Sequence, residues 1–317
     1  MCTAIAYRDE DRYLGRNLDV ERGYGERIVI TPRNAPLRFR CADTLLSHYA
    51  MIGMATVVDR FPLYYDAINE KGLGMAALAF RENAYYPPYI KGKKNIAPFE
   101  LIPFVLGVCS NMDEVRALVE TINLVKIDFS EEMPLSPLHF MISDQKESMV
   151  LESVKEGLFL YENPFEVLTN NPPFPFHTTY LSHYTALHTG NAEMKFDLRY
   201  PLKSYSYGMG AMGLPGDFSS ASRFVRAFFV KENSLSFREE QERVCHLFHI
   251  LSSVAMPKGC VLTENGYEYT RYTAWCNLDR GIYYYSTYDQ LAIQAVSLWD
   301  FDLERDDLFL WLVESLE

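Results

Sequence analysis

The 317-residue sequence lacks several features that would place it in a familiar class. It has no internal repeat, no low-complexity tract and no obvious linker. Its six cysteines form no CxxC pair, which disfavours a zinc ribbon or a thioredoxin-type redox site. No stretch approaches the ~20 apolar residues of a membrane-spanning helix, because the most apolar run, 101–109, is broken by Pro103.

Positive charge is also scarce, with 30 Lys and Arg against 42 Asp and Glu and a net charge of −12. This balance argues against a nucleic-acid or anionic-membrane partner, since both need a basic surface. The first residues carry charge early, from Arg8 to Arg12, which does not fit the apolar core of a secretory signal. We therefore expect a cytoplasmic protein whose thiols are reduced.

The residues that are present predict one layered domain. Hydrophobic residues make up 48% of the chain and charged residues 23%, enough for a sizeable core. Short apolar runs predict strands, and capping residues mark helix starts. Because strands and helices come in blocks rather than in regular alternation, we expect an α+β fold of stacked layers and a single domain over residues 1–317. The expected strands are Thr3–Tyr7, Arg27–Thr31, Tyr49–Val58, Leu63–Ile68, Leu73–Phe80, Leu138–Ser143, Ser148–Ser153, Gly157–Tyr161, Phe165–Thr169, Tyr269–Cys276, Gly281–Tyr288 and Gln290–Leu298, and the expected helices are Phe99–Cys109, one starting at Asn111, one from Ser219 or Ser220 to Val230, and Glu239–Ser252.

One motif is a decoy. Residues 208–213 match GxGxxG, but a dinucleotide site needs a strand before the motif and a helix opening on it. Pro215 and Gly216 stand where that helix would begin. We expect no nucleotide, no metal and no other cofactor.

The most informative residue is Cys2. Removal of Met1, common before a small residue, would give a cysteine with a thiol and a free α-amine. These groups have ordinary pKa values near ~8.5 and ~7.7–8.0, so one residue supplies a nucleophile and its own base. By position alone, Cys2 also fits a small residue that opens an edge strand.

Other polar residues strengthen the catalytic interpretation. Arg16 near the thiol would favour thiolate, and Asp19 would hold the amine. Asn170 at a strand end is placed to donate to an oxyanion, and Arg223 lies in the first turns of a predicted helix. Taken singly, Arg16 and Asp19 also fit an ion pair at a turn, Asn170 fits turn chemistry, and Arg223 fits a solvated helix charge.

Together, these segments resemble the choloylglycine hydrolase family, which contains bile salt hydrolases and penicillin V acylases. The similarity extends from Met1 to about Val296. It is carried by Met1-Cys-Thr, Gly-Arg-Asn-Leu-Asp (15–19), Asn-Glu-Lys-Gly-Leu (69–73), Leu-Thr-Asn-Asn-Pro (168–172) and Gly-Leu-Pro-Gly-Asp-Phe-Ser-Ser-x-Ser-Arg-Phe (213–224).

The resemblance implies the four-layer αββα sandwich of the N-terminal-nucleophile hydrolases and hydrolysis of a linear amide bond. It implies that Cys2 is nucleophile and base, that Asp19 binds the amine and that Asn170 donates to the oxyanion. Arg16 would sit beside the thiol, and Arg223 would complete the charged site. It also suggests a homo-oligomer, a tetramer.

The sequence departs from the family at two positions. Bile salt hydrolases usually carry Asn where this chain has Ala79, and penicillin V acylases often carry Tyr there. The oxyanion hole then relies on a backbone N–H with Asn170, or on a nearby group such as Asn83. Val20 stands where relatives often have an aromatic residue.

The resemblance favours a glycine- or taurine-conjugated bile salt as the small-molecule substrate. Its steroid would be received by Val20, Ala79 and apolar loops around Phe61, Tyr64, Phe80, Tyr85 and Phe140, although each of these aromatics also fits core packing. Penicillin V or another linear N-acyl amide is the alternative substrate. Two further classes remain open: a non-catalytic steroid binder that keeps Met1, and a thiol redox protein. Because the chain is acidic and the conjugates are anionic, any attraction must come locally from Arg16, Arg81 or Arg223.

Overall fold

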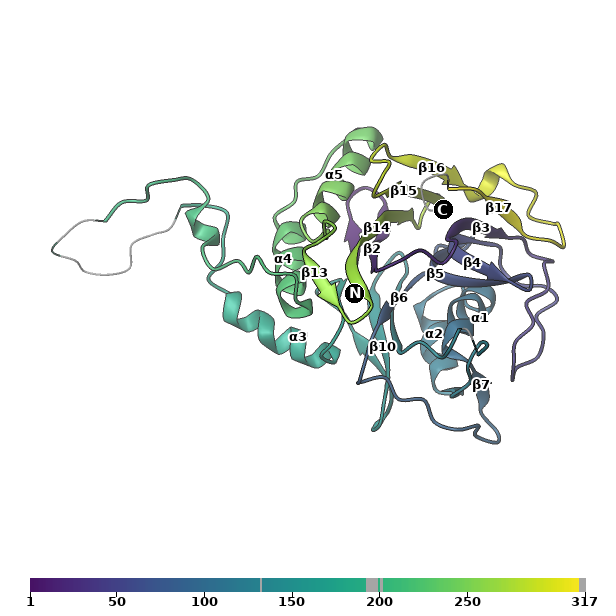
Figure 1. Ribbon diagram of the computed structural model, residues 1–317. Helices are drawn as coiled ribbons and strands as arrows, with labels where there is room; N and C mark the ends of the chain where they lie inside the picture. The colour runs from purple at the N-terminus through teal and green to yellow at the C-terminus, as the bar shows by residue number, and fades with distance from the viewer. Residues whose placement is uncertain (132, 192–198, 200–201, 314–317) are drawn as a thin grey trace.

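Two antiparallel sheets form the centre of the molecule (Figure 1). The computed structural model describes residues 1–131, 133–191, 199 and 202–313. The first sheet has seven strands. Their order is β12 (Val167–Leu168), β1 (Cys2–Arg8), β2 (Arg12–Val20), β14 (Gly266–Asn277), β15 (Ile282–Thr287) and β16 (Gln294–Ser297), with β13 (Val261–Thr263) paired to β14.

The second sheet has eight strands, and a small parallel pair lies apart from it. The order of the eight is β11 (Gly157–Glu162), β10 (Ser148–Val154), β9 (Leu138–Ser143), β6 (Gly74–Ala79), β5 (Phe61–Asn69), β4 (Met51–Val58), β3 (Arg27–Thr31) and β17 (Phe309–Trp311). The parallel pair is β7 (Lys94–Ile96) and β8 (Ile122–Leu124).

Helices cover the outer face of each sheet (Figure 1). Helices α4 (Ser220–Glu232) and α5 (Glu240–Ser252) pack on the first sheet, and α1 (Leu101–Val108) and α2 (Met112–Val119) lie on the side of the second. The predicted αββα sandwich is thereby confirmed. The predicted caps are confirmed too, because the side chains of Asn111 and Ser219 accept from backbone N–H groups in the first turns of α2 and α4. The remaining helical segments are α3 (Phe174–Leu181), η1 (Pro98–Glu100), η2 (Ser182–Tyr184), η3 (Met209–Ala211) and η4 (Leu298–Asp300).

The second sheet separates two hydrophobic cores. Alternate side chains of a strand point to opposite faces, so Ile68 and Ala76 join one core and Ala67 and Met75 the other. The inner core contains Cys2 and is shared with the first sheet, α4 and α5. The outer core lies between the second sheet and α1 and α2.

Several segments differ from the expectation, among them the short strands β7, β8, β13 and β17, which the sequence did not predict. Arg12–Val20, which the apolar pattern does not predict, is a strand between β1 and β14. It is buried along almost its whole length, and its polar residues at 16, 17 and 19 interrupt the apolar run that would mark such a strand. The segment after Asn171 is helix α3 rather than a turn, because Pro at the helix start has no N–H to lose. The last predicted strand is shorter and ends in η4. Within the described ranges, no helix has both the length and the apolar character needed to cross a membrane.

Candidate active site

Cys2 is the first residue of β1 and is almost fully buried, with 4% of its surface exposed. Strand β2 runs antiparallel beside it, so Arg16 lies opposite Ala4 and its side chain reaches back to the thiol. Arg16 Nη2 donates to Cys2 Sγ over 2.8 Å. This contact stabilises negative charge on the sulfur.

The second sheet holds Arg16 in place. Its Nη1 donates to the carbonyl oxygens of Tyr65 (2.8 Å) and Ala77 (3.0 Å) and lies 3.8 Å from the carboxylate of Asp66. Burial opposes the charge of Arg16, but Cys2, Tyr272 and Asp66 keep its pKa above the ordinary value. The guanidinium is therefore a fixed cation behind the nucleophile.

Asp66 is a site residue that sequence reasoning missed. It is fully buried, and its two oxygens accept hydrogen bonds from Tyr272 (2.5 Å) and Tyr283 (2.6 Å) of the first sheet. The available signal was a lone acid in the apolar run Tyr-Tyr-Asp-Ala-Ile of β5. A buried carboxylate needs such partners, and here they join the two sheets behind Arg16.

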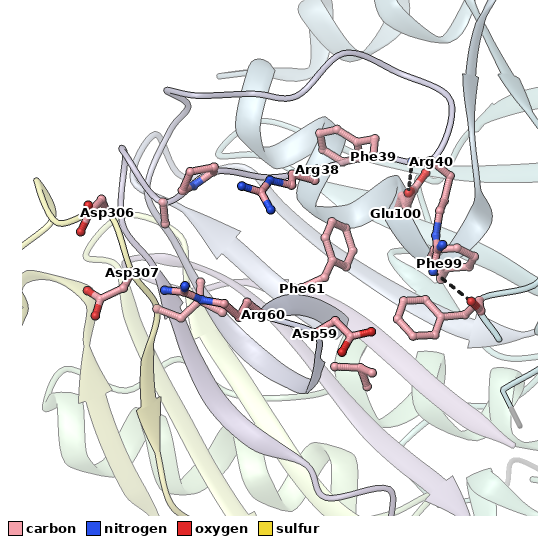
Figure 2. A pocket seen from close by; sticks show the side chains of 15 residues that line it. Arg38, Phe39, Arg40, Asp59, Arg60, Phe61, Phe99, Glu100, Asp306 and Asp307 are labelled. Carbon is pink, nitrogen blue, oxygen red and sulfur yellow. Dashed lines mark hydrogen bonds between the residues drawn. The ribbon is translucent and has the colours of Figure 1, made fainter.

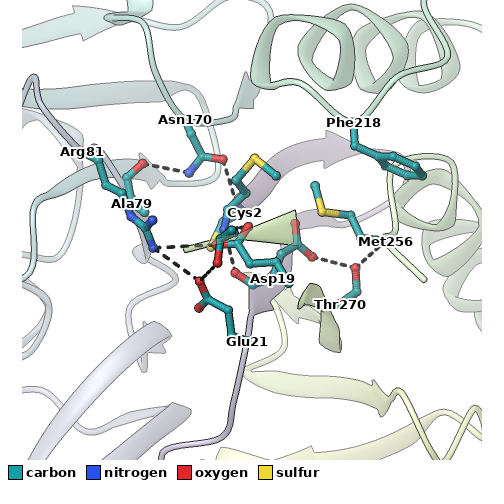
Figure 3. A network of polar contacts seen from close by, with 12 residues as sticks. Cys2, Asp19, Glu21, Ala79, Arg81, Asn170, Phe218, Met256 and Thr270 are labelled. Atoms are coloured by element: carbon teal, nitrogen blue, oxygen red, sulfur yellow. Dashed lines mark hydrogen bonds and ion pairs between the residues drawn. The ribbon is translucent and has the colours of Figure 1, made fainter. Parts of the chain in front are cut away.

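Asp19 sits near the end of β2, buried beside the chain terminus (Figure 3). Met1 extends the β1–β2 ladder, since its amine donates to Asp19 O (2.8 Å) and its carbonyl accepts from Asp19 N (3.0 Å). Asp19 Oδ1 accepts from Thr270 Oγ1 over 2.6 Å, while Oδ2 has no hydrogen-bond partner in the described part of the chain. That buried oxygen is therefore a free hydrogen-bond acceptor within the described ranges.

Asn170 contacts the nucleophile residue directly. Its Oδ1 accepts from Cys2 N (2.8 Å) and from Arg223 Nη2 (2.7 Å). Its Nδ2 donates to Ala79 O over 2.8 Å, which leaves the second N–H of the amide for a developing oxyanion. Figure 3 shows Asn170 pointing toward Cys2 and Ala79.

Arg223 is fully buried in α4 and completes the enclosure of Cys2. Its Nη1 donates to Cys2 O (2.5 Å) and to Thr3 Oγ1 (2.6 Å). Burial lowers its pKa, while the charges of Asp19 and Cys2 act in the opposite direction. The structure thus brings together all five predicted catalytic residues.

The backbone of Asn170 is held by two further residues, His177 and Ser220. His177 Nε2 bonds to Asn170 O over 2.9 Å, and Asn170 N donates to Ser220 Oγ over 2.8 Å. Burial lowers the pKa of His177 to about 4, so it is a neutral donor at pH 7. His177 has no sequence signal, and Ser220 is predicted only as a possible helix cap, because both contacts depend on where α3 and α4 pack.

Ala79 ends β6 beside Asn170 and offers no side-chain donor. Asn83, the predicted substitute, donates to Arg81 O over 3.2 Å rather than facing Cys2. Ala79 thus offers Asn170 only its backbone carbonyl, and Asn83 does not replace the missing amide.

Three of the five aromatic residues predicted to line the pocket lie on the side of the second sheet away from Cys2. Phe61, Tyr64 and Phe140 pack in the outer core, on the opposite face of the second sheet from Cys2. A one-residue step along a strand changes the face, and the sequence alone did not fix which face each residue takes. We do not propose these three as substrate contacts.

Phe61 borders a separate cavity of about 640 Å³ (Figure 2). The cavity lies at the β4–β5 turn beside Phe39, Phe99 and Arg38, and none of the five predicted catalytic residues lines it. Its position explains why Phe61 is only half-buried while it packs edge-on against Phe39.

Val20 and Phe80 lie on the catalytic side. Val20 is half-buried at the end of β2 and packs on the inner core. Phe80 is fully buried and stacks on His139 at 4.3 Å between ring centroids, and His139 in turn bonds to Thr169 O. Phe80 therefore supports the strand end that carries Asn170. Among the described residues, no cluster of His, Cys, Asp or Glu could hold a metal ion.

Comparison with known proteins agrees with this geometry. The family model for linear amide C–N hydrolases of the choloylglycine hydrolase family matches residues 2–311. The chain therefore belongs to the choloylglycine hydrolase family, a class of hydrolases that cleave linear amides.

Individual relatives are close. The chain is 50% identical to a bile salt hydrolase/transferase of Lactiplantibacillus plantarum over 99% of its own length and 98% of the relative. It superposes on a mutant conjugated bile acid hydrolase from Clostridium perfringens with a TM-score of 0.93 and 33% identity, covering 99% and 98% of the two chains. A penicillin V acylase from Agrobacterium tumefaciens shares the fold, with a TM-score of 0.77 and 20% identity over 97% of this chain and 90% of that one.

Proposed function

We propose that the protein hydrolyses the amide bond of bile salts conjugated to glycine or taurine, with Cys2 as nucleophile once Met1 has been removed. The observation that carries the proposal is the site itself: Arg16 donates to Cys2 Sγ, and Asp19 Oδ2 is buried and unpaired beside the terminus. The bile-salt activities named for the L. plantarum and C. perfringens relatives support this choice of substrate.

The chemistry follows from the contacts. The Cys2 thiolate attacks the amide carbonyl, and its negative charge moves to the carbonyl oxygen, which accepts from the free N–H of Asn170. The α-amine, oriented by Asp19, carries the thiol proton to the leaving nitrogen, so the C–N bond breaks as a neutral amine departs. Water then adds to the thioester while the α-amine of Cys2 accepts one of its protons. The C–S bond breaks, the α-amine returns that proton to the Cys2 sulfur, and the acid product loses its own proton to solvent and leaves as a carboxylate.

The acyl side of the substrate has to approach the ends of β2 and β6. We propose Val20 and Ala79 as residues that contact it, because Val20 is half-buried on the inner core and Ala79 is half-buried beside Asn170. Two small side chains leave more room there than an aromatic residue and an amide would. Phe80 acts beneath them by packing, through His139.

We further propose that the protein is a cytoplasmic homotetramer and that each chain is a single hydrolase domain spanning residues 1–317. Exposed apolar side chains on described residues between α3 and α4 support the oligomer. They are Leu202 (67% exposed), Tyr205 (85%), Tyr207 (91%) and Met212 (65%). Sedimentation equilibrium of the purified protein tests the tetramer.

A substrate panel on protein of verified mass tests the function. Glycine and taurine conjugates of a bile acid are compared with penicillin V and an acyl-homoserine lactone, and release of each amine is measured. Rapid penicillin V cleavage beside background release of glycine and taurine would move the assignment to the acylase branch. Full turnover by Cys2→Ser, or by protein that retains Met1, would overturn the mechanism and leave a steroid binder or another chemistry to explain.

A further inference from the structure

The proposed substrate carries a carboxylate or sulfonate, whereas the protein has a net charge of −12. Binding therefore needs a local cation with unused donors. Arg16 and Arg223 are almost fully buried, with 1% and 0% exposed, and they already donate to Cys2 and neighbouring groups. Neither arginine is therefore available to bind the carboxylate or sulfonate of the substrate.

Arg81 is the exposed arginine at this site. It lies two residues after the end of β6, and 57% of its side chain is exposed. Its Nη2 lies 3.8 Å from Glu268 Oε1 and 4.0 Å from Glu21 Oε1 (Figure 3). Both separations exceed hydrogen-bond distance, and no hydrogen bond of this guanidinium occurs within the described ranges, so its donors are free to bind an anion.

The backbone of Arg81 is fixed to the catalytic segment. Asn171 Nδ2 donates to Arg81 O, and Asn170 Nδ2 donates to Ala79 O. Two consecutive asparagines thus fasten the 79–81 turn to the strand end that carries the oxyanion donor. The guanidinium is therefore carried by a turn whose position is set relative to Cys2.

Two carboxylates orient that guanidinium. Burial acts to raise the pKa of Glu21, but the hydrogen bond from Thr263 and the charge of Arg81 bring it below the ordinary value. Glu268 is buried, with 3% of its side chain exposed. Without Arg81, an incoming anion would meet two carboxylates with no exposed cation between them.

The position of Met1 points to the space that a substrate would use. Its amine lies 2.8 Å from Glu268 Oε2, so one carboxylate lies between Met1 and Arg81. Removal of Met1 opens this volume beside Cys2 and frees the backbone N–H and C=O of Asp19 that Met1 had paired. The opened volume is bounded by the nucleophile and the Glu268–Arg81 pair.

We propose that Arg81 is a specificity-determining residue that binds the carboxylate or sulfonate of the leaving amino acid in the space vacated by Met1. This assignment rests on the proposed function and adds to it the part of the site that recognises the conjugate rather than the steroid. A planar guanidinium binds either anion through two N–H groups. An uncharged headgroup gains nothing from it.

The test compares Arg81→Gln and Arg81→Lys with the wild type on two substrates: a glycine-conjugated bile acid, and the same conjugate with its carboxylate capped as a primary amide. We expect Arg81→Gln to raise KM for the anionic conjugate about tenfold with little change in kcat, because a hydrogen-bonded charge is lost. KM for the capped conjugate should stay within twofold. Arg81→Lys should recover part of the loss, and added salt should reduce the difference.

Arg38→Gln is the matched control, since it removes the same charge from an exposed residue on the separate cavity. An equal rise in KM for Arg38→Gln would show that only net charge matters and would overturn the assignment. If Arg81→Gln left the ratio of the KM values for the two conjugates unchanged, either with no effect or with an equal rise in both, the assignment would also be overturned. The hydrolase function would remain intact. Absence of turnover of either conjugate by the wild type would overturn the proposed function, and the Arg81 assignment with it.

Discussion

His177 makes the stability of the active-site wall depend on pH. Its side chain is fully buried, its ring stacks on Phe224 at 5.1 Å between centroids, and its Nε2 bonds to Asn170 O. Burial lowers its pKa from the ordinary 6.5 to about 4. The folded chain therefore binds fewer protons at this residue than the unfolded chain between these two values.

The sign follows from linkage. The stability due to neutral His177 is fully present above pH 6.5, falls as the pH drops below that value, and is lost as the pH passes about 4. The gap between 6.5 and about 4, at about 1.4 kcal/mol for each pH unit, corresponds to a loss of about 3 kcal/mol. Since the free energy of unfolding of a domain is only about 5–15 kcal/mol, this loss is readily measured.

Urea unfolding at pH values between about 7 and 4 measures this contribution as the difference between wild type and His177→Gln. Glutamine keeps an N–H donor for Asn170 O but does not titrate, so the pH dependence of the variant should be shallower by about 3 kcal/mol over that range. The control is His183→Gln, because His183 is exposed on the neighbouring η2 and should leave the slope unchanged. A slope for His177→Gln that equals the wild-type slope would refute the reasoning.

Three further substitutions test the catalytic geometry. Thr270→Val removes the donor to Asp19 Oδ1 and should lower kcat about tenfold with KM unchanged, as measured by steady-state kinetics, because the charged hydrogen bond that fixes the carboxylate is lost; unchanged kcat would contradict it. Ala79→Asn introduces an amide beside Asn170 and should raise kcat, by up to the roughly 10²–10³-fold that one oxyanion donor supplies. A lower kcat in the same assay would count against an incomplete oxyanion hole. Phe140→Ala should cost about 3–5 kcal/mol in urea unfolding and leave KM within twofold, whereas a large rise in KM would return this residue to the acyl pocket.

Much of the site could be predicted because its residues lie in short segments with clear local sequence signals. Cys2 is defined by its position, and the short apolar run that follows it predicts its strand. Arg223 follows a capping serine that fixes where α4 begins, and Asn170 ends a strand just before a proline-rich helix start. Local rules place such residues without knowledge of the whole fold.

The rest depends on partners far apart in the sequence. Asp66 gains its role from Tyr272 and Tyr283, more than 200 residues away, and no local pattern announces such a pairing. Strand β2 was missed because polar side chains that contact the site occupy positions where a periodicity rule expects apolar ones. The prediction that Phe61 and Tyr64 contact the substrate is wrong because the face that each residue takes depends on strand register. That register includes an irregularity in the β4–β5 pairing, which the sequence does not reveal.

Because folding pairs Met1 with Asp19, removal of Met1 and folding of the chain compete in time. On the proposed mechanism an aminopeptidase has to bind Met1 in an extended and accessible form. In the folded chain, however, the Met1 amine is held by the Asp19 carbonyl and by Glu268, and only 28% of the Met1 side chain is exposed. Chains that fold before they are trimmed hide the bond that must be cut. The active fraction of a preparation would then record how fast the host trims new chains relative to their folding, as well as how good the catalyst is.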